Sequence, residues 1–137
     1  MHTTNQGIIV SGGSRGLGLH LVQRLLEQGN RVATFARSHT EHVDALTSKH
    51  PENFLFAELD AIDAKGVGDF FSNVAAKFGR VDTVLNNAAI GQDQLLMHTD
   101  LDTVHRIVDI NIIGPTILTR IAVKHMMLHG GGNICSI

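Results

Sequence analysis

Tyrosine and tryptophan are absent from this sequence of 137 residues, and cysteine occurs once, as Cys135. Without tyrosine, no reaction catalysed by these residues can use a phenol as its proton donor. A single cysteine excludes an internal disulfide. No apolar run reaches the roughly 18 residues of a membrane-spanning helix, and the first residues lack the apolar core of a signal peptide. We therefore expect a cytoplasmic protein that does not contact a membrane.

Runs of one charge sign are also missing. With a net charge of −2 and a pI near 6.5, the chain offers no electrostatic attraction to nucleic acid, so a small molecule is the expected partner. Nine histidines are many for this length, and His125 and His129 have the i, i+4 spacing of two metal ligands on one helix face. The sequence places no third ligand beside them. We expect a solvated helix end there and no metal site.

The chain has the size and composition of one domain, residues 1–137, with a single core. Short apolar runs alternate in it with longer stretches of helical period. The runs that we expect to form buried strands are residues 7–11, 31–36, 54–60, 81–86 and 133–137.

Helical patterns fill the intervals between these runs. The first and third patterns are apolar stripes that end at Gly29 and Gly79, each a C-terminal cap. The second is weaker and covers residues 40–50. The fourth begins near Thr99, whose hydroxyl would cap its first turn, and runs to about residue 129. The stripes consist of Leu17, Leu21, Val22, Leu25 and Leu26 in the first helix, and of Val67, Phe70, Phe71, Val74 and Phe78 in the third, which Asp63 opens.

Strand and helix alternate four times, so neighbouring strands must pair in parallel, and each crossover carries the chain back across a sheet face. With right-handed crossovers, the expected architecture is α/β: a doubly wound parallel sheet between two layers of helices. This architecture hosts many functions. The evidence for function therefore has to come from the loops.

The first strand leads through 11-SGGSRGLG-18 directly into the first helix. Gly12, Gly16 and Gly18 would let the backbone turn sharply and approach a pyrophosphate, whose charge the free N–H groups of the helix N-terminus would meet. Glycines also occur in turns that bind nothing, but a strand before the loop and a helix after it are the context of a nucleotide site. We therefore predict nucleotide binding.

With this loop, the sequence resembles the classical short-chain dehydrogenase/reductases. Its spacing Gly-x-x-x-Gly-x-Gly is similar to theirs, with Ser11 where the family usually has threonine. Asp60 after the third strand, 86-NNAA-89 after the fourth and Asn111 in the long helix stand at the family's distances. The resemblance covers essentially the whole chain and implies a Rossmann fold. Within the family, the chain looks most like the 3-oxoacyl-acyl-carrier-protein reductases.

The resemblance implies a nicotinamide cofactor, and the end of the second strand indicates which one. An NAD-selective site has an acid there that binds the ribose 2′-OH, but this chain has Ala36. Arg37 follows, Arg15 in the glycine loop can approach the same group, and guanidinium groups suit a 2′-phosphate. Either arginine alone could be an ordinary surface residue. Together, with the acid missing, they predict NADP(H).

For two of the residues that the resemblance implies for cofactor binding, the sequence leaves a second role open or sets a requirement on the backbone. Asp60 would accept a hydrogen bond from the adenine amino group, as in the family, or else cap a turn. Ala89 replaces the family's glycine, which is acceptable as long as residue 89 does not need a positive φ. The residues that the resemblance implies for cofactor binding are Gly12, Ser14, Arg15, Gly16, Leu17, Gly18, Arg37, Ser38, Asp60, Ala61, Asn87, Ala88 and Ala89.

Asn111 is the one catalytic residue that the resemblance implies for this chain. In the family, its main-chain carbonyl holds a water that connects to the active-site lysine. In a regular helix that carbonyl would accept from the N–H of residue 115, and Pro115 has none. Since asparagine and proline are both unfavourable inside a helix, we expect a functional reason for them.

The family's catalytic serine and its Tyr-x-x-x-Lys are not in this chain. The serine would be expected just beyond Ile137, so we expect a domain truncated after the fifth strand and inactive by itself. Such a domain has an edge strand and an uncovered helix flank, and we expect it to form a homo-oligomer or to be part of a larger ordered whole. The flank consists of Ile112, Ile113, Ile117, Leu118 and Ile121.

The first hypothesis is thus the cofactor-binding part of an NADP(H)-dependent short-chain oxidoreductase that acts on a small carbonyl or alcohol substrate. The second is a non-catalytic NADP(H)-binding or assembly module. A third, an S-adenosylmethionine-dependent transferase, explains neither Arg37 nor Asn111.

Overall fold

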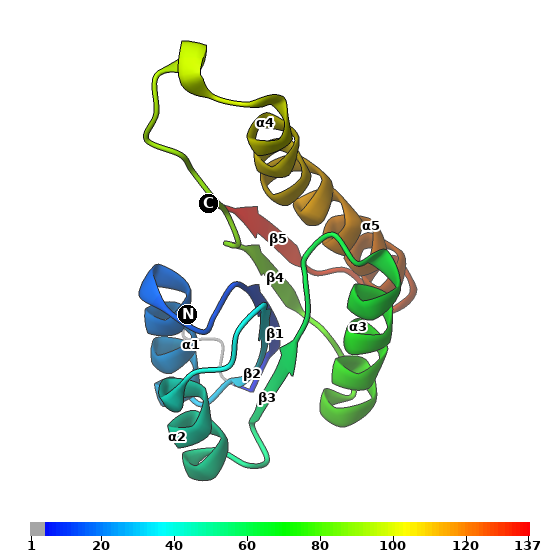
Figure 1. The fold of residues 1–137 in the computed structure, drawn as a ribbon. Coiled ribbons are helices and arrows are strands. Elements are labelled where there is room, and N and C mark those ends of the chain that lie inside the picture. The colour runs from blue at the N-terminus through cyan, green and yellow to red at the C-terminus, as the bar shows by residue number, and fades with distance from the viewer. Residues whose placement is uncertain (1–4) are drawn as a thin grey trace.

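The computed structural model describes residues 5–137 as an α/β fold around a parallel sheet of five strands (Figure 1). The strands lie in the order β3-β2-β1-β4-β5, and every neighbouring pair is parallel. The chain changes direction across the sheet between β1 and β4, as in a doubly wound fold. The predicted fold class is confirmed. The strands are β1 (Gly7–Ser11), β2 (Arg31–Ala36), β3 (Phe54–Glu58), β4 (Thr83–Asn86) and β5 (Asn133–Ser136).

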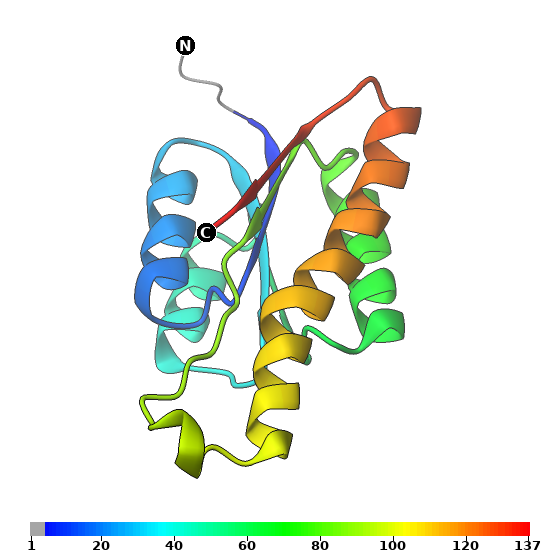
Figure 2. The same ribbon diagram turned by 90° about the horizontal axis from the view of Figure 1, so that it is seen from above.

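Helices cover both faces of the sheet (Figure 2). The first two lie on one face, and the third and fifth lie on the other, so the molecule has three layers. No helix within residues 5–137 has the length and hydropathy of a bilayer-spanning segment. The helices are α1 (Gly16–Glu27), α2 (Glu41–Lys49), α3 (Ala64–Phe78), α4 (Leu101–Val108) and α5 (Gly114–Leu128), with a short 3-10 turn η1 (Leu96–His98) before α4.

Alternating side chains of the central strand face two cores, one on each side of the sheet, so the expectation of a single core is wrong. Val10 of β1 packs with Val22 of α1 on one face of the sheet. Ile9, the preceding residue, points to the opposite face and packs with Phe70 of α3 and Leu118 of α5. All five side chains are buried. Each stabilises the fold by about 1.5–3 kcal/mol relative to an exposed side chain.

Local signals fix the ends of α1 and α3 as predicted. Asp63 Oδ1 accepts a hydrogen bond from the N–H of Gly66 at 2.9 Å and caps the start of α3. Gly29 and Gly79 follow α1 and α3 with φ angles of 81° and 78°, in the left-handed region that favours glycine.

Three expectations about burial are wrong. Leu17, predicted for the core, is 55% exposed because it lies in the first turn of α1 and lines a pocket, and Leu19 is buried instead. Leu118, predicted on an uncovered flank, is 1% exposed because it packs in the core beside α3. All residues of β5 are exposed, since this strand lies at the edge of the sheet and contributes no side chain to either core.

The predicted start of the long helix at Thr99 is also wrong. Asp100 is the N-cap of α4, and its Oδ1 accepts from the N–H of Thr103 at 2.7 Å. The Thr99 hydroxyl donates instead to the carbonyl of Leu95, in the preceding turn. Asp100 offers a charged acceptor one residue closer to the helix, where negative charge is favourable.

The long helix contains one wide turn. Between α4 and α5, η2 (Asp109–Ile113) is a π-helical turn in which the N–H of Gly114 donates to the carbonyl of Asp109, five residues back. Pro115 follows directly and has no N–H, so the regular hydrogen-bond ladder cannot pass through this point. Turns of this kind are rare and occur frequently at functional sites.

Candidate functional site

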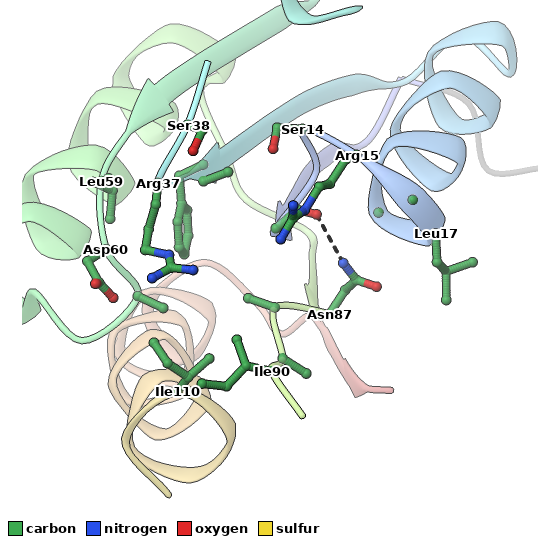
Figure 3. Close-up of a pocket in the computed structure, with 18 of the residues that line it drawn as sticks. Ser14, Arg15, Leu17, Arg37, Ser38, Leu59, Asp60, Asn87, Ile90 and Ile110 are labelled. Atoms are coloured by element: carbon green, nitrogen blue, oxygen red, sulfur yellow. Dashed lines mark hydrogen bonds between the residues drawn. The ribbon is translucent and has the colours of Figure 1, made fainter. Parts of the chain in front are cut away.

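The carboxyl ends of the first four strands surround a pocket of about 390 Å³ (Figure 3). Its position is that of ligand sites in doubly wound sheets, where the strand order reverses. All thirteen residues that the resemblance implies for cofactor binding line it, whereas Asn111 does not. The other lining residues are Phe35, Ala36, Thr40, Leu59, Ile90 and Ile110.

The glycine loop lines this pocket with backbone that has no side chains at Gly12, Gly16 and Gly18. Gly12 and Gly16 have φ angles of 73° and 56°, which favour glycine. A Cβ on Gly18 would overlap the Gly12 carbonyl oxygen, so α1 packs directly against the loop. Arg15, the N-cap residue of α1, makes no capping hydrogen bond with its side chain. The first N–H groups of α1 are thus left for an anion.

Two threonines that sequence reasoning missed hold this loop. Thr34 Oγ1 in β2 accepts from the N–H of Gly13 at 2.9 Å and donates to the carbonyl of Val10. Thr40 Oγ1, at the start of α2, donates to the carbonyl of Ser14 at 3.1 Å. One signal was present in the sequence: a threonine inside a buried strand needs a polar partner.

Two arginines from different loops stand at the pocket. Arg15 belongs to the glycine loop and Arg37 follows β2, and both are exposed. Within residues 5–137, neither guanidinium group has a carboxylate oxygen within 4.0 Å. Residue 36, between β2 and Arg37, is alanine and carries no charge. The pocket therefore presents two cationic groups that can bind an anion.

Asp60, after β3, has partners for both of its carboxylate oxygens. Oδ2 accepts from Arg106 Nη2 at 2.8 Å, and Oδ1 accepts from the N–H of Ile62 at 3.3 Å. Partial burial raises the pKa of Asp60, but the hydrogen bonds from Arg106 and Ile62 and the charges of Arg106 and Arg37 lower that pKa below its usual value. The Ile62 bond is the turn cap that we considered, and adenine binding stays a prediction.

Ser11 joins the loop after β4 to the glycine loop. Its Oγ accepts from the N–H groups of Asn87 and Ala88 at 3.1 and 3.0 Å. Asn87 Nδ2 donates back to the Ser11 carbonyl at 3.0 Å. It also donates to the Gly12 carbonyl at 3.2 Å, the bond that Figure 3 marks. Among residues 5–137, Asn5 is the only residue other than glycine with a positive φ. Ala89 therefore meets the condition set for it.

The side chain of Asn111 has a role that we did not predict. Its Oδ1 accepts from the N–H of Ile90 at 2.9 Å, and its Nδ2 donates to the carbonyl of Ile90 at 2.8 Å. One side-chain amide thus pairs with both the N–H and the carbonyl of a single residue in the loop after β4. Only asparagine and glutamine have a side chain with such a donor and acceptor together. The catalytic role of the Asn111 carbonyl stays a prediction.

The two histidines at the end of α5 stack on each other instead of converging on a point. Their ring centroids are 4.0 Å apart, and His125 Nε2 accepts from the N–H of Val81 at 3.3 Å. His129 Nδ1 lies 2.7 Å from the carbonyl oxygen of His125. In the described part of the chain, residues 5–137, no three metal-binding side chains come together.

Comparisons with known proteins identify the family of the chain. The family model described as short chain dehydrogenase matches residues 6–137. An uncharacterized oxidoreductase of Schizosaccharomyces pombe is 33% identical over 138 residues, which cover 100% of this chain and 46% of that protein. A 3-oxoacyl-[acyl-carrier-protein] reductase of Chlamydia pneumoniae is 29% identical over 133 residues, which cover 95% of this chain and 53% of that protein.

A solved structure gives the same result for the fold. The crystal structure of a short-chain dehydrogenase from Burkholderia cenocepacia, in complex with NADP, matches 98% of this chain and 56% of its own with a TM-score of 0.85 at 26% identity. The chain thus spans about half the length of these relatives. Because the family model matches residues 6–137, the chain belongs to the short-chain dehydrogenase family.

Proposed function

We propose that this chain is the NADP(H)-binding part of a short-chain oxidoreductase. The observation that carries the proposal is the pair Arg15 and Arg37, exposed at the pocket and without an ion-pair partner among residues 5–137. A 2′-phosphate carries about two negative charges, and guanidinium groups bind its oxygens through short, charge-assisted hydrogen bonds. Ala36 supplies no carboxylate that would repel it.

The glycine loop fits the rest of the same cofactor. Because Gly12 and Gly16 have no side chains, a pyrophosphate can approach the backbone N–H groups at the start of α1. The relative from Burkholderia cenocepacia was solved with NADP, which supports the same ligand for this chain. When bound, NADP(H) supplies the hydride chemistry, and the residues of this chain hold and orient it.

For the whole protein, we propose carbonyl reduction or alcohol oxidation of a small molecule. The similarity to a 3-oxoacyl-[acyl-carrier-protein] reductase supports this chemistry, since a 3-oxoacyl group contains a ketone. In the family, a serine and a Tyr-x-x-x-Lys act on the substrate oxygen, and these 137 residues contain no tyrosine. We propose that they bind the cofactor without turnover, because no phenol can protonate the substrate oxygen.

Calorimetric titration of the purified chain with NADPH, NADH and S-adenosylmethionine tests the proposal. NADPH should bind more tightly than NADH, and S-adenosylmethionine should not compete with it. Arg37→Ala should weaken NADPH binding about tenfold or more and change NADH binding little, because a hydrogen bond to a charged group contributes about 1.5–3 kcal/mol. Arg24→Ala is the matched control, since Arg24 lies on the surface of α1 in an exposed pair with Glu27.

Two results would contradict the proposal. One is a folded chain that binds NADH as tightly as NADPH. The other is an Arg37→Ala variant whose NADPH binding equals that of the Arg24→Ala control.

A further inference from the structure

An ion pair connects the long helix to the pocket. Arg106, in the last turns of α4, reaches Asp60 after β3, 46 residues away in sequence, with 2.8 Å between Nη2 and Oδ2. The other carboxylate oxygen accepts from the N–H of Ile62. The Asp60 side chain is 30% exposed and that of Arg106 is 35% exposed. The carboxylate is therefore held on the side of α4 although water can reach it.

A second cation is close to the same carboxylate. Arg37 lines the pocket together with Asp60, and its charge contributes to the lowered pKa of Asp60, after partial burial, which opposes it, and the hydrogen bonds from Arg106 and Ile62. Figure 3 shows the Arg37 side chain on the same side of the pocket as Asp60. Arg37 nevertheless forms no ion pair within residues 5–137. Of these two arginines, only Arg106 is paired with Asp60.

We propose that Arg106 is a positioning residue for cofactor selectivity: it holds the Asp60 carboxylate toward α4, so that Arg37 stays available for the 2′-phosphate of NADP(H). The inference rests on the proposed function. Without Arg106, the Asp60 carboxylate turns to Arg37 and competes with the phosphate for its guanidinium group. Arg106 itself contacts no part of the cofactor in this scheme.

The test compares 2′,5′-ADP with 5′-AMP, which differ only in the 2′-phosphate, so contacts to adenine, ribose and the 5′-phosphate cancel in the ratio of their affinities. In Arg106→Leu, this ratio should fall about fivefold, because a competing, partly exposed ion pair forms at Arg37. Arg106→Lys should keep most of the ratio. In the double variant Arg106→Leu/Asp60→Asn the competing carboxylate is gone, and the ratio should recover.

The outcomes separate the inference from the proposed function. If wild type binds both ligands equally, NADP(H) selectivity fails and the inference fails with it. If wild type prefers 2′,5′-ADP but Arg106→Leu keeps the wild-type ratio, or weakens both ligands by the same factor, Arg106 only braces the fold and the inference alone is wrong. A double variant without recovery of the ratio overturns it as well.

A titration without ligand gives a second readout. The Asp60 carboxyl carbon can be followed by NMR in Arg106→Leu and in Arg106→Leu/Arg37→Ala. If Arg37 captures the acid, the pKa of Asp60 stays low in the single variant and rises in the double variant. An equal rise in both variants would show that Arg37 does not take the place of Arg106.

Discussion

Gly18 occupies the point where the glycine loop touches the first helix. A Cβ there would overlap the Gly12 carbonyl oxygen and lie 2.5 Å from Asn87 Nδ2. We expect Gly18→Ala to lower the free energy of unfolding by about 1–3 kcal/mol, because the loop has to move. Gly68→Ala on α3, whose Cβ would meet no atom within 4 Å, should raise it by about 0.5–1 kcal/mol. Urea denaturation measures both, and equal effects at the two positions would contradict the close packing of the loop.

His125 couples protonation to folding. Its Nε2 accepts from the N–H of Val81, so the ring is neutral in this contact. Burial lowers the pKa of His125, the charges of His129 and Arg80 lower it further, and Asp82 opposes them only in part. The unfolded chain therefore binds this proton more readily than the folded one. The stability that depends on neutral His125 is complete above its ordinary pKa of 6.5 and is lost as the pH falls below it.

We therefore expect the free energy of unfolding to decrease between about pH 7.5 and about pH 5, and to decrease less in His125→Gln. Glutamine keeps an acceptor for the N–H of Val81 but does not titrate. Chemical denaturation at several pH values measures the two slopes. His20→Gln, on the exposed side of α1, is the control and should keep the wild-type slope. A His125→Gln slope equal to that of the control would exclude the coupling.

At the level of elements, the Asn111 side chain joins the long helix to the loop after β4 by hydrogen bonds. Asn111→Ala removes both hydrogen bonds to the backbone of Ile90. We expect the free energy of unfolding to fall by about 1–3 kcal/mol and the Ile90 amide to exchange faster with solvent. Thr116→Ala is the control, because the Thr116 hydroxyl donates within its own helix, to the Ile112 carbonyl. Hydrogen exchange followed by NMR measures the effect, and an Ile90 amide that stays protected in Asn111→Ala would disprove it.

Element ends could be predicted from sequence where the signal is local. The Asp63 cap involves groups three residues apart, and no other part of the chain changes it. The predicted start of α4 was wrong because Thr99 and Asp100 are adjacent and both can cap a helix, so the local signal is ambiguous. The pair of Asp60 and Arg106 could not be predicted, since it depends on where α4 lies relative to the loop after β3.

For the molecule as a whole, the topology could be predicted because alternating strands and helices with right-handed crossovers leave few arrangements. The same rules do not determine which apolar residues are covered. Leu118 and Ile112 belong to one long helix, yet they are 1% and 58% exposed. β5 is as apolar in sequence as an inner strand, and all of its residues are exposed. Apolar composition indicates that burying a segment is favourable. Only the packing of the elements shows which apolar residues are covered, and by which neighbours.

The outer side of α4 and η2 is the part of the surface from which we expect self-association. Leu101, Val108 and Ile112 are 72%, 44% and 58% exposed there. Covering apolar surface favours association by about 25 cal/mol per Å². In a dimer with two-fold symmetry, the same apolar residues of both copies contribute to one contact. A second copy of the chain can therefore cover this side.

We expect the chain to sediment with a mass above the 14.8 kDa of the monomer at micromolar concentration. The double variant Val108→Lys/Ile112→Lys should sediment as a monomer, because association would then bury four unpaired charges in each dimer. Ser48→Lys, on the opposite face of the molecule in α2, adds a charge away from the contact and should associate like wild type. A wild type that stays monomeric at the highest concentration reached, or a double variant that associates as strongly, would show that this side does not mediate self-association.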